Sequence, residues 1–392
     1  MLHVALGMTS KDIIFQRLLR QGITGPGFSD AGAVVGWMGC MQAQDYAQAK
    51  WAIGLRAAGV TEAQIEREID AGRILRTHIL RPTWHWVLPA DIGWMLTLTG
   101  PRVRAFAQPM VRKLGIGKDE LVRSKKILVK ALSAGGAARE AEAGGEPAGG
   151  GALTRVELAE LFRRGKINTD DIRMNYLMMD AELEGLICNG PRRGKQFTYA
   201  LLEERVQGAA RFEGDAAIGE LARRYILSRG PATVQDFAWW SGFSLAMAGR
   251  GIELVRGLLE KVVVGGRDYW FCGEQDGQAG AITGRGHAGV KSRGRASGVL
   301  LLPAFDEYTV GYADRSDVLA EEYKKLSFHG LRPAIVINGK IVGLWRRVLG
   351  KGKVVVEVSL FEKVSSANRA LIGKEAKRFG SFTGNKVVEV VL

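Results

Sequence analysis

Two glutamines, one residue apart, have the side-chain types and spacing to do chemistry. Gln42 and Gln44 lie in the polar stretch from Cys40 to Trp51, where polar residues alternate with alanine. If the chain is extended here, both side chains point the same way, because strand side chains alternate with a period of two. Two primary amides on one side form paired donors and acceptors that can hold a water or the edge of a base. The alternative is a polar loop in which the Gln-x-Gln spacing is incidental.

The elements around this stretch predict what positions it. An amphipathic helix comes directly before it, and an earlier helix begins with Thr9 or Ser10 as its N-cap. A further helix and two strand-like runs follow, and helices followed by a two-stranded hairpin are typical of a winged helix. The predicted elements are helices over 10–20, 29–38 and 62–71, and strands over 74–80 and 83–87.

The same order of elements is predicted twice more along the chain. The second copy has helices over 118–132, 154–162 and 171–186 and a hairpin over 186–200, and the third has helices over 216–228, 233–240 and 244–259 and strands over 262–271. The hairpin of the second copy carries Arg192, Arg193 and Lys195 among glycines, as a wing that offers cations to phosphates does. Between its first two helices, 133–151 is almost entirely Ala, Gly and Glu, which predicts a flexible insertion.

The C-terminal part differs in character. Gly284 to Gly289 matches G-x-G-x-x-G, but it neither follows a clear strand nor opens a helix, so with Lys291 and Arg293 it is better interpreted as a mobile basic loop. Strand-like runs and one helix then predict a small, partly closed β-barrel. These elements are strands over 299–302, 333–337, 340–348, 353–360 and 386–392 and a helix over 365–379.

We therefore predict an α+β protein with three tandem winged-helix (helix-turn-helix) domains followed by a small β-barrel-like C-terminal domain. The first domain, 1–115, carries the Gln-x-Gln loop, and the second, 116–212, contains the insertion at 133–151. The third covers 213–283, and the barrel covers 284–392.

Charge and composition limit which partners, location and cofactors are expected for this protein. The 55 Lys and Arg against 41 Asp and Glu leave a net charge of +14, which favours a polyanionic partner, although some families are simply basic. No apolar run is long enough to span a bilayer, and three distant cysteines argue against a disulfide framework, so we expect a soluble cytoplasmic protein without a membrane partner. The five histidines show no metal-ligand spacing, and no phosphate-binding or hydrolase motif is present, so no metal or other cofactor is expected.

Four motifs, in order, resemble the winged-helix DNA glycosylases of the AlkZ and YcaQ type. These are Gln-Ala-Gln-Asp at 42–45, Arg-Pro-Thr-Trp-His-Trp-Val at 81–87, Thr-Val-Gln-Asp-Phe-Ala-Trp-Trp-Ser-Gly at 233–242 and Leu-Leu-Pro-Ala-Phe-Asp-Glu-Tyr at 301–308. The resemblance implies a C-shaped clamp of three winged helices plus a barrel on duplex DNA. It also implies a monofunctional glycosylase that excises N7-alkylated purines, including those in interstrand crosslinks, with Gln42 and Gln44 as the catalytic pair.

A non-catalytic winged-helix DNA-binding protein, such as a regulator, is the alternative. A regulator usually dimerises to match two half-sites, whereas a clamp of three modules in one chain can act as a monomer, which we expect here. The residues expected to contact double-stranded DNA are Lys50, Arg81, Trp84, His85, Arg173, Asn175, Arg192, Arg193, Lys195, Lys291 and Arg293.

Several side chains have two open interpretations. Trp239 and Trp240 either belong to the core or stack on bases. Asp306 and Glu307 either pair with internal cations or take part in catalysis. In the first wing, alternation places Trp84 and Trp86 on one face and His85 on the other, so either face could enter a groove.

Overall fold

Two compact units make up the chain in the computed structural model, which describes residues 7–143, 151–170, 172–273, 298–350 and 353–391. One unit contains residues 1–66 and 218–392, and the other contains 67–217. Among the described residues, no helix is both long and apolar enough to cross a membrane. The division into three winged-helix domains and a fourth C-terminal domain stays a prediction beside this two-unit partition.

The N-terminal part of the first unit contains short helices and one short strand. Thr9 is the N-cap of the first helix, where it forms a capping box with Asp12. The strand and the first part of the helix after it lie in the polar stretch from Cys40 to Trp51. The elements are α1 (Ser10–Arg20), α2 (Ala31–Met38), β1 (Cys40–Gln42), α3 (Tyr46–Arg56) and α4 (Glu62–Asp70), which continues into the second unit.

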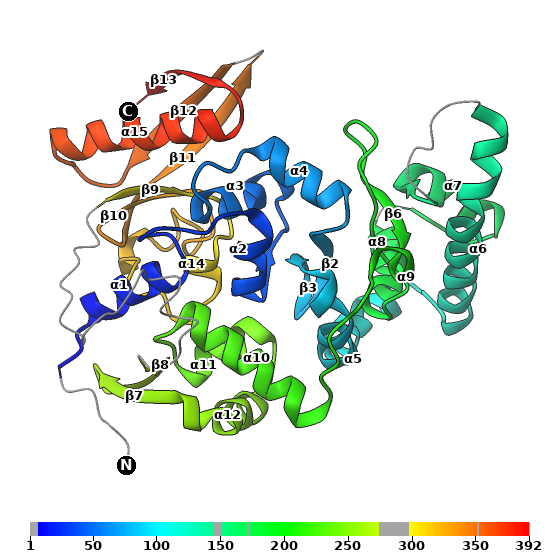
Figure 1. Ribbon diagram of the computed structural model, residues 1–392, viewed down its shortest axis with the longest axis horizontal. Coiled ribbons are helices and arrows are strands. Elements are labelled where there is room, and N and C mark those ends of the chain that lie inside the picture. The colour runs from blue at the N-terminus through cyan, green and yellow to red at the C-terminus, as the bar shows by residue number, and fades with distance from the viewer. Residues whose placement is uncertain (1–6, 144–150, 171, 274–297, 351–352, 392) are drawn as a thin grey trace. The chain divides into compact units, whose positions relative to one another are not determined.

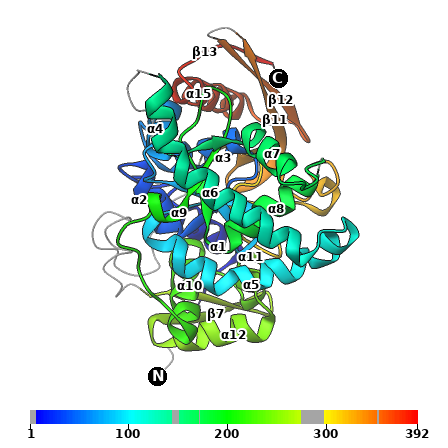
Figure 2. The same ribbon diagram turned by 90° about the vertical axis from the view of Figure 1, so that its right-hand side faces the viewer.

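The same unit resumes in the helix α10 (Gly214–Arg229) and continues through α11 (Val234–Ser241) and α12 (Leu245–Leu254). Thr233 caps α11 with a capping box, because its side chain accepts from the Asp236 N–H while the Asp236 carboxylate accepts from the Thr233 N–H. A short 3₁₀ turn, η1 (Arg256–Leu258), leads into the antiparallel hairpin β7 (Leu259–Val264) and β8 (Arg267–Cys272). Figure 2 shows α12 beside β7.

The predicted C-terminal β-barrel is wrong. The described strands form an open five-stranded sheet in the order β13-β12-β11-β10-β9, with β13 and β9 at its edges. The physical reason is the helix that connects β12 to the last strand. This crossover lets β13 run parallel to β12, so β13 becomes an edge strand and does not pair with β9. That helix packs on the sheet in both views (Figures 1 and 2). The bounds are β9 (Val299–Leu302), β10 (Ala334–Ile337), β11 (Lys340–Gly350), β12 (Lys353–Leu360), α15 (Ser366–Phe382) and β13 (Lys386–Val391).

A largely irregular segment connects β9 to β10, and it is continuously buried from Asp306 to Tyr312. It includes the single-turn helix α14 (Glu307–Val310) and the 3₁₀ turn η2 (Glu321–Tyr323). Asp306 is the N-cap of α14, because its carboxylate accepts from the Tyr308 N–H at 2.8 Å. All four residues of α14 are buried, so this turn lies within the core of the unit.

The second unit packs long helices against short strands. Its main core is formed by leucines, isoleucines and methionines of α6, α7 and α8 together with the strands β5 and β6. The helix α6 continues to Ala143, while 144–150 lie outside the described residues, and the flexible insertion over 133–151 stays a prediction. The elements are β2 (Leu75–Ile79), β3 (Arg81–Val87), α5 (Pro89–Lys113), α6 (Lys118–Ala143), β4 (Leu153–Thr154), α7 (Arg155–Arg164), α8 (Ile172–Leu183), β5 (Ile187–Asn189), β6 (Thr198–Leu201) and α9 (Leu202–Arg205).

Candidate functional site

The Gln-x-Gln pair lies where strand β1 turns into helix α3. Gly39, with φ 72°, ends α2 and allows the chain to enter the strand. Asp45 is the N-cap of α3, and its carboxylate accepts from the Gln48 N–H at 3.1 Å. Local sequence therefore determines both ends of the segment between α2 and α3, from Gly39 to Asp45. The carboxylate nearest to the two glutamines in sequence is committed to the start of a helix.

The two glutamines differ in environment. Gln42 is the last residue of β1 and is 7% exposed, whereas Gln44 is exposed and lies in a bend. The Gln42 Oε1 accepts from the Gln44 backbone N–H at 2.8 Å. Strand β1 ends at Gln42, so strand alternation does not continue to Gln44. What holds the pair together is a side-chain-to-backbone hydrogen bond rather than the alternation of a strand.

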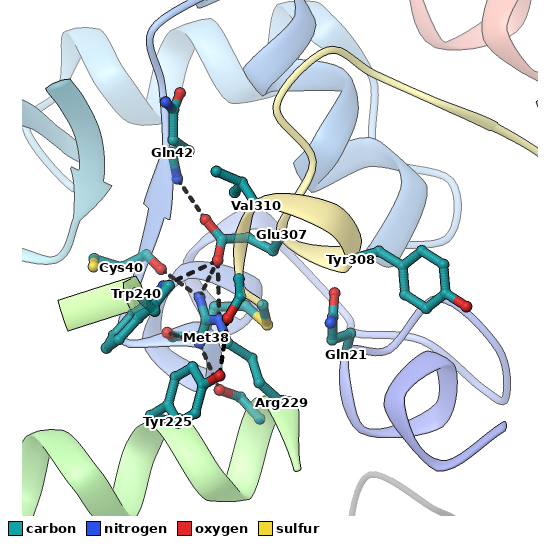
Figure 3. A network of polar contacts seen from close by, with 12 residues as sticks. Gln21, Met38, Cys40, Gln42, Tyr225, Arg229, Trp240, Glu307, Tyr308 and Val310 are labelled. Carbon is teal, nitrogen blue, oxygen red and sulfur yellow. Dashed lines mark hydrogen bonds and ion pairs between the residues drawn. The ribbon is translucent and has the colours of Figure 1, made fainter. Parts of the chain in front are cut away.

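A buried carboxylate lies behind the strand (Figure 3). The Glu307 Oε1 accepts from the Gln42 backbone N–H at 2.7 Å. Its Oε2 accepts from the Arg229 Nε at 2.9 Å, from the Arg229 Nη2 at 2.7 Å and from the Trp240 Nε1 at 3.1 Å. The Gln42 side chain points away from this carboxylate. Glu307 and Arg229 are both at most 1% exposed, so the ion pair is shielded from solvent.

The neighbouring carboxylate anchors the helix on the other side of the glutamines. Asp306 accepts from both terminal nitrogens of Arg56, each at 2.8 Å, and Arg56 lies at the end of α3. Burial by itself lowers the pKa of Arg56, but Asp306 outweighs burial and raises the pKa above its ordinary value. Gln21 accepts from Arg56 at 2.7 Å and donates to the Tyr312 hydroxyl at 2.9 Å. Burial is the main cause that raises the pKa of Tyr312 to about 12, so the hydroxyl is neutral at physiological pH.

The open question about Asp306 and Glu307 is therefore answered by their contacts. Both carboxylates pair with internal arginines, and these arginines come from α3 and α10. Sequence reasoning did not single out Arg56 or Arg229. The available signal was the Asp-Glu pair itself, since two adjacent acids after an apolar strand need buried cations if they are inside.

The two adjacent tryptophans have different environments. Trp240 is fully buried and bonded to Glu307, so it belongs to the core. Trp239 is 46% exposed, and its indole donates to the Val310 carbonyl at 3.1 Å. Cys40 is fully buried, as expected for a small hydrophobic side chain next to the site.

Lys50 does not present its charge to solvent. It is 3% exposed, and it forms ion pairs with Glu62, at 2.6 Å, and with Glu66. A phosphate could reach this ammonium only by displacing a glutamate. The prediction of a DNA contact at Lys50 is therefore not supported by its position.

The residues of the first hairpin in the second unit are largely covered. His85 is fully buried, and its Nδ1 lies 2.9 Å from the Thr83 carbonyl, so the face that carries His85 does not enter a groove in this conformation. Arg81 and Trp84 are partly buried. The Trp84 ring packs against His78, with 4.4 Å between ring centroids, and the Arg76 guanidinium lies 4.6 Å from its ring centre.

On α8, Arg173 and Asn175 differ in what they can offer a ligand. The Arg173 Nη2 donates to both carboxylate oxygens of Glu120, each at 2.7 Å, and the Arg173 side chain is 14% exposed. Such a pair makes Arg173 a weak candidate for a DNA contact. Asn175 is exposed on the same helix.

The tip of the β5–β6 hairpin carries exposed residues among the predicted DNA-binding positions. Arg193 pairs with Glu157 at 2.6 Å but is exposed, and Lys195 is exposed. Arg192 is partly buried, with its backbone N–H donating to the Asp70 carboxylate at 2.8 Å. Lys291, Arg293 and the glycine-rich loop before them lie outside the described residues.

Within the described ranges, no group of three or more His, Cys, Asp or Glu side chains could hold a metal ion. The polar chemistry available at β1 is therefore that of two neutral amides beside a buried, internally neutralised carboxylate. Neutral amides can orient a small polar molecule but do not change protonation state near neutral pH.

Comparison with known proteins identifies the class. A family described as DNA glycosylase AlkZ-like matches residues 35–382, so the chain belongs to the AlkZ-like DNA glycosylase family. It is an enzyme that acts as a DNA glycosylase in DNA repair, and it binds DNA.

One relative matches in both sequence and structure. A protein of Streptomyces sahachiroi named "Interstrand DNA cross-link repair glycosylase" is 23% identical over 347 residues, which cover 85% of each chain. The solved structure of the Streptomyces sahachiroi DNA glycosylase AlkZ has a TM-score of 0.74 at 21% identity and covers 98% of this chain and 99% of its own. The resemblance in the sequence is thus confirmed at the level of the family and the mixed α/β fold.

Proposed function

We propose that this glycosylase hydrolyses the N-glycosidic bond of N7-alkylated purines in double-stranded DNA, with Gln42 and Gln44 holding the attacking water. The observation that carries the proposal is the Gln-x-Gln turn itself. Gln42 is buried with its side-chain oxygen bonded to the Gln44 N–H, and the exposed Gln44 follows in a bend. A side-chain-to-backbone hydrogen bond thus holds the two glutamines within one turn, and we infer that their amides can orient one small molecule there.

The chemistry of the substrate fits a site without a titrating base. An N7-alkylpurine carries a positive charge, so its bond to the sugar is weakened and the base leaves as a neutral molecule without being protonated. In the reaction, the water oxygen bonds to C1′, the C1′–N9 bond breaks with its electron pair going to the base, and the water proton is lost to solvent. The protein mainly has to place the water and stabilise the charge that develops on the sugar.

The carboxylates near the two glutamines do not replace the amides in this scheme. Both oxygens of Glu307 accept hydrogen bonds from the protein, and Arg229 neutralises its charge. Asp45 is bonded to the backbone of α3. A site with little carboxylate assistance accelerates the loss of a cationic base more than the loss of an undamaged purine, which favours selectivity for damaged DNA.

Interstrand crosslinks are a finer part of the proposal. The name of the Streptomyces sahachiroi relative mentions interstrand crosslinks, and we infer that crosslinked N7-alkylpurines are also substrates of this chain. Duplexes with a single N7-alkylguanine and with a defined crosslink would be compared at equal concentration. Release from the first substrate only would limit the activity to monoadducts.

We also propose that DNA is held by winged helices. In the second unit, α6, β4, α7, α8 and the β5–β6 hairpin follow one another in the order typical of a winged helix, with the strand order β4-β6-β5. In the first unit, α10, α11, α12 and the β7–β8 hairpin repeat this order. Exposed Arg193, Lys195 and Asn175 are the proposed DNA contacts of the second copy. We expect one chain to act as a monomer, which its mass in solution at working concentration would test.

The test of the proposed function is direct. The protein is incubated with a duplex that contains one N7-methylguanine, and abasic sites are then cut with alkali. Strand scission at the lesion, absent from an undamaged duplex, is the expected result. Binding without scission, under conditions where the protein is folded, would favour the non-catalytic DNA-binding alternative instead.

A further inference from the structure

Two consecutive acidic residues anchor the segments on either side of the Gln42–Gln44 turn. Glu307 accepts from the Gln42 backbone N–H on β1, and Asp306 binds Arg56 at the end of α3. Both acids lie at the start of the buried single turn α14. The single turn α14 thus contacts both β1, which ends at Gln42, and α3, which begins after Gln44.

The Glu307–Arg229 pair occupies one edge of strand β1. The Arg229 Nη2 donates to the Cys40 carbonyl at 2.8 Å, and the Glu307 Oε1 accepts from the Gln42 N–H at 2.7 Å. Backbone groups two residues apart lie on the same edge of a strand, so one ion pair supplies both the donor and the acceptor that a neighbouring strand would supply. The Arg229 Nη1 also donates to the Met38 carbonyl at 2.8 Å, directly before the strand.

The edge of a strand is ordinarily bonded by a neighbouring strand rather than by an ion pair. This difference indicates that the ion pair fixes the geometry of the β1 backbone. Replacing a buried ion pair with apolar residues is often neutral or stabilising, so such a pair is weak support for stability as such. A hydrogen bond to a charged acceptor is shorter and stronger than a neutral one, and it fixes the donor more closely. Here the donor is the backbone of Gln42, whose side chain points away from Glu307 (Figure 3).

We propose that Glu307 is a positioning residue that sets the backbone of Gln42, and through it the direction of the Gln42 amide. The proposal rests on the proposed function, because the direction of this amide affects the rate only if the amide takes part in the reaction. Glu307 itself does not contact substrate. Two nitrogens of Arg229 donate to Oε2 of Glu307 and hold the carboxylate in place, and the Trp240 indole donates to the same oxygen.

Glu307→Gln is the variant that separates this role from folding. A glutamine has one acceptor, and Arg229 carries a full charge, so the new amide oxygen should turn towards Arg229. Its NH₂ group then faces the Gln42 N–H, which places a donor against a donor. The variant should keep hydrogen bonds to Arg229 while it loses the one to Gln42. Glu307→Asp, which keeps the charge but shortens the reach, gives a second test if the first variant folds poorly.

Asp236 provides a matched control. Its carboxylate is 2% exposed, pairs with Arg17 at 3.5 Å and accepts from the Thr233 and Ala313 backbones. None of these partners belongs to β1 or α3. Asp236→Asn therefore removes a buried charge from the same unit without changing what holds the glutamines. All three variants would be assayed well below their melting temperatures.

The readouts are the single-turnover rate of N7-methylguanine release, the affinity for the same duplex, and the amide resonance of Gln42. A misplacement of about 1 Å can cost about 100-fold in rate, so Glu307→Gln and Glu307→Asp should slow release by about 10- to 100-fold with little change in affinity. Asp236→Asn should release base at the wild-type rate. In protein labelled with ¹⁵N-glutamine, the Gln42 peak, identified by its loss in Gln42→Ala, should shift in both Glu307 variants and not in Asp236→Asn.

The outcomes separate this inference from the proposed function. Absence of release by the wild-type protein refutes the proposed function. Release by the wild-type protein that is slowed by Gln42→Ala but unchanged in both Glu307 variants overturns the positioning role alone. Equal slowing by Asp236→Asn and the Glu307 variants would mean that any lost buried charge has this effect, and it would also overturn the role.

Discussion

Truncation of either glutamine tests the proposed chemistry most directly. Gln42→Ala and Gln44→Ala should each slow the single-turnover release of N7-methylguanine while leaving the affinity for the duplex nearly unchanged. A contact made only in the transition state lowers the chemical rate without weakening ground-state binding. Loss of one positioned neutral contact costs about 2–4 kcal/mol, which corresponds to a rate decrease of about 30- to 1,000-fold.

The structure predicts that the two variants differ in stability. Gln42→Ala also removes the hydrogen bond from the Gln44 N–H to the Gln42 side chain, which contributes about 0.5–1.5 kcal/mol. Gln44 is exposed, so Gln44→Ala should change the free energy of unfolding by no more than about 0.5 kcal/mol. The double variant should lose less rate than the sum of the two, because both amides act on one water.

Three controls isolate the role of the amides. Gln235→Ala removes an exposed glutamine from α11 in the same unit and should leave the rate unchanged. Gln42→Glu keeps an acceptor for the Gln44 N–H but places a charge at a position that is 7% exposed, so it should not recover the stability that Gln42→Ala loses. The wild-type rate should stay flat across neutral pH, since amides do not titrate. If both alanine variants release base at the wild-type rate, the glutamines are only loop residues and the mechanism is refuted.

Three further predictions concern other parts of the chain. Lys195→Ala should weaken duplex binding regardless of sequence and reduce the salt slope by about one unit, and an unchanged slope would mean that the hairpin tip does not touch phosphate. Arg56→Ala should lower the free energy of unfolding in urea by about 3–5 kcal/mol, because it leaves the buried Asp306 carboxylate unpaired. Burial raises the pKa of Glu220, but hydrogen bonds from the two arginines that follow it in α10 outweigh burial and lower the pKa below its ordinary value. Its stabilisation is therefore present above the ordinary pKa and lost as the pH falls through the lower folded-state pKa, so Glu220→Gln should be less stable than wild type at pH 7 and equally stable at strongly acidic pH. A difference that persists in acid would contradict this.

Much of the secondary structure could be predicted from local signals. Thr9, Thr154 and Thr233 each begin a helix with a capping box, and the acid three residues later completes it. Asn338-Gly339 lies between two apolar runs, which is a strong hairpin signal, and it forms the turn between β10 and β11. These features depend on residues within a few positions of each other, so no tertiary context is needed to recognise them.

The errors occur where distant contacts decide the structure. The C-terminal strands have the right positions, but their order depends on the crossover through α15, which makes β13 an edge strand rather than the closing strand of a barrel. Local propensity does not determine which strand pairs with which. The DNA contacts expected at Lys50 and Arg173 stay predictions, but the ion pairs of these residues with Glu62 and Glu120 become visible only once the helices pack together.

The candidate site likewise combines features that are local in the sequence with features that only tertiary contacts determine. The sequence by itself singles out Gln42 and Gln44 as the candidate catalytic pair, because their residue type and spacing are local. It also indicates the family through four short motifs. It left Asp306 and Glu307 ambiguous, since an acid is a catalyst or a structural ion depending on what surrounds it. Only the tertiary structure places Arg229 against Glu307 and the Glu307 carboxylate against the Gln42 backbone, across separations of 78 and 265 residues. Burial in a low-dielectric core makes those long-range pairings obligatory, and no local pattern encodes them.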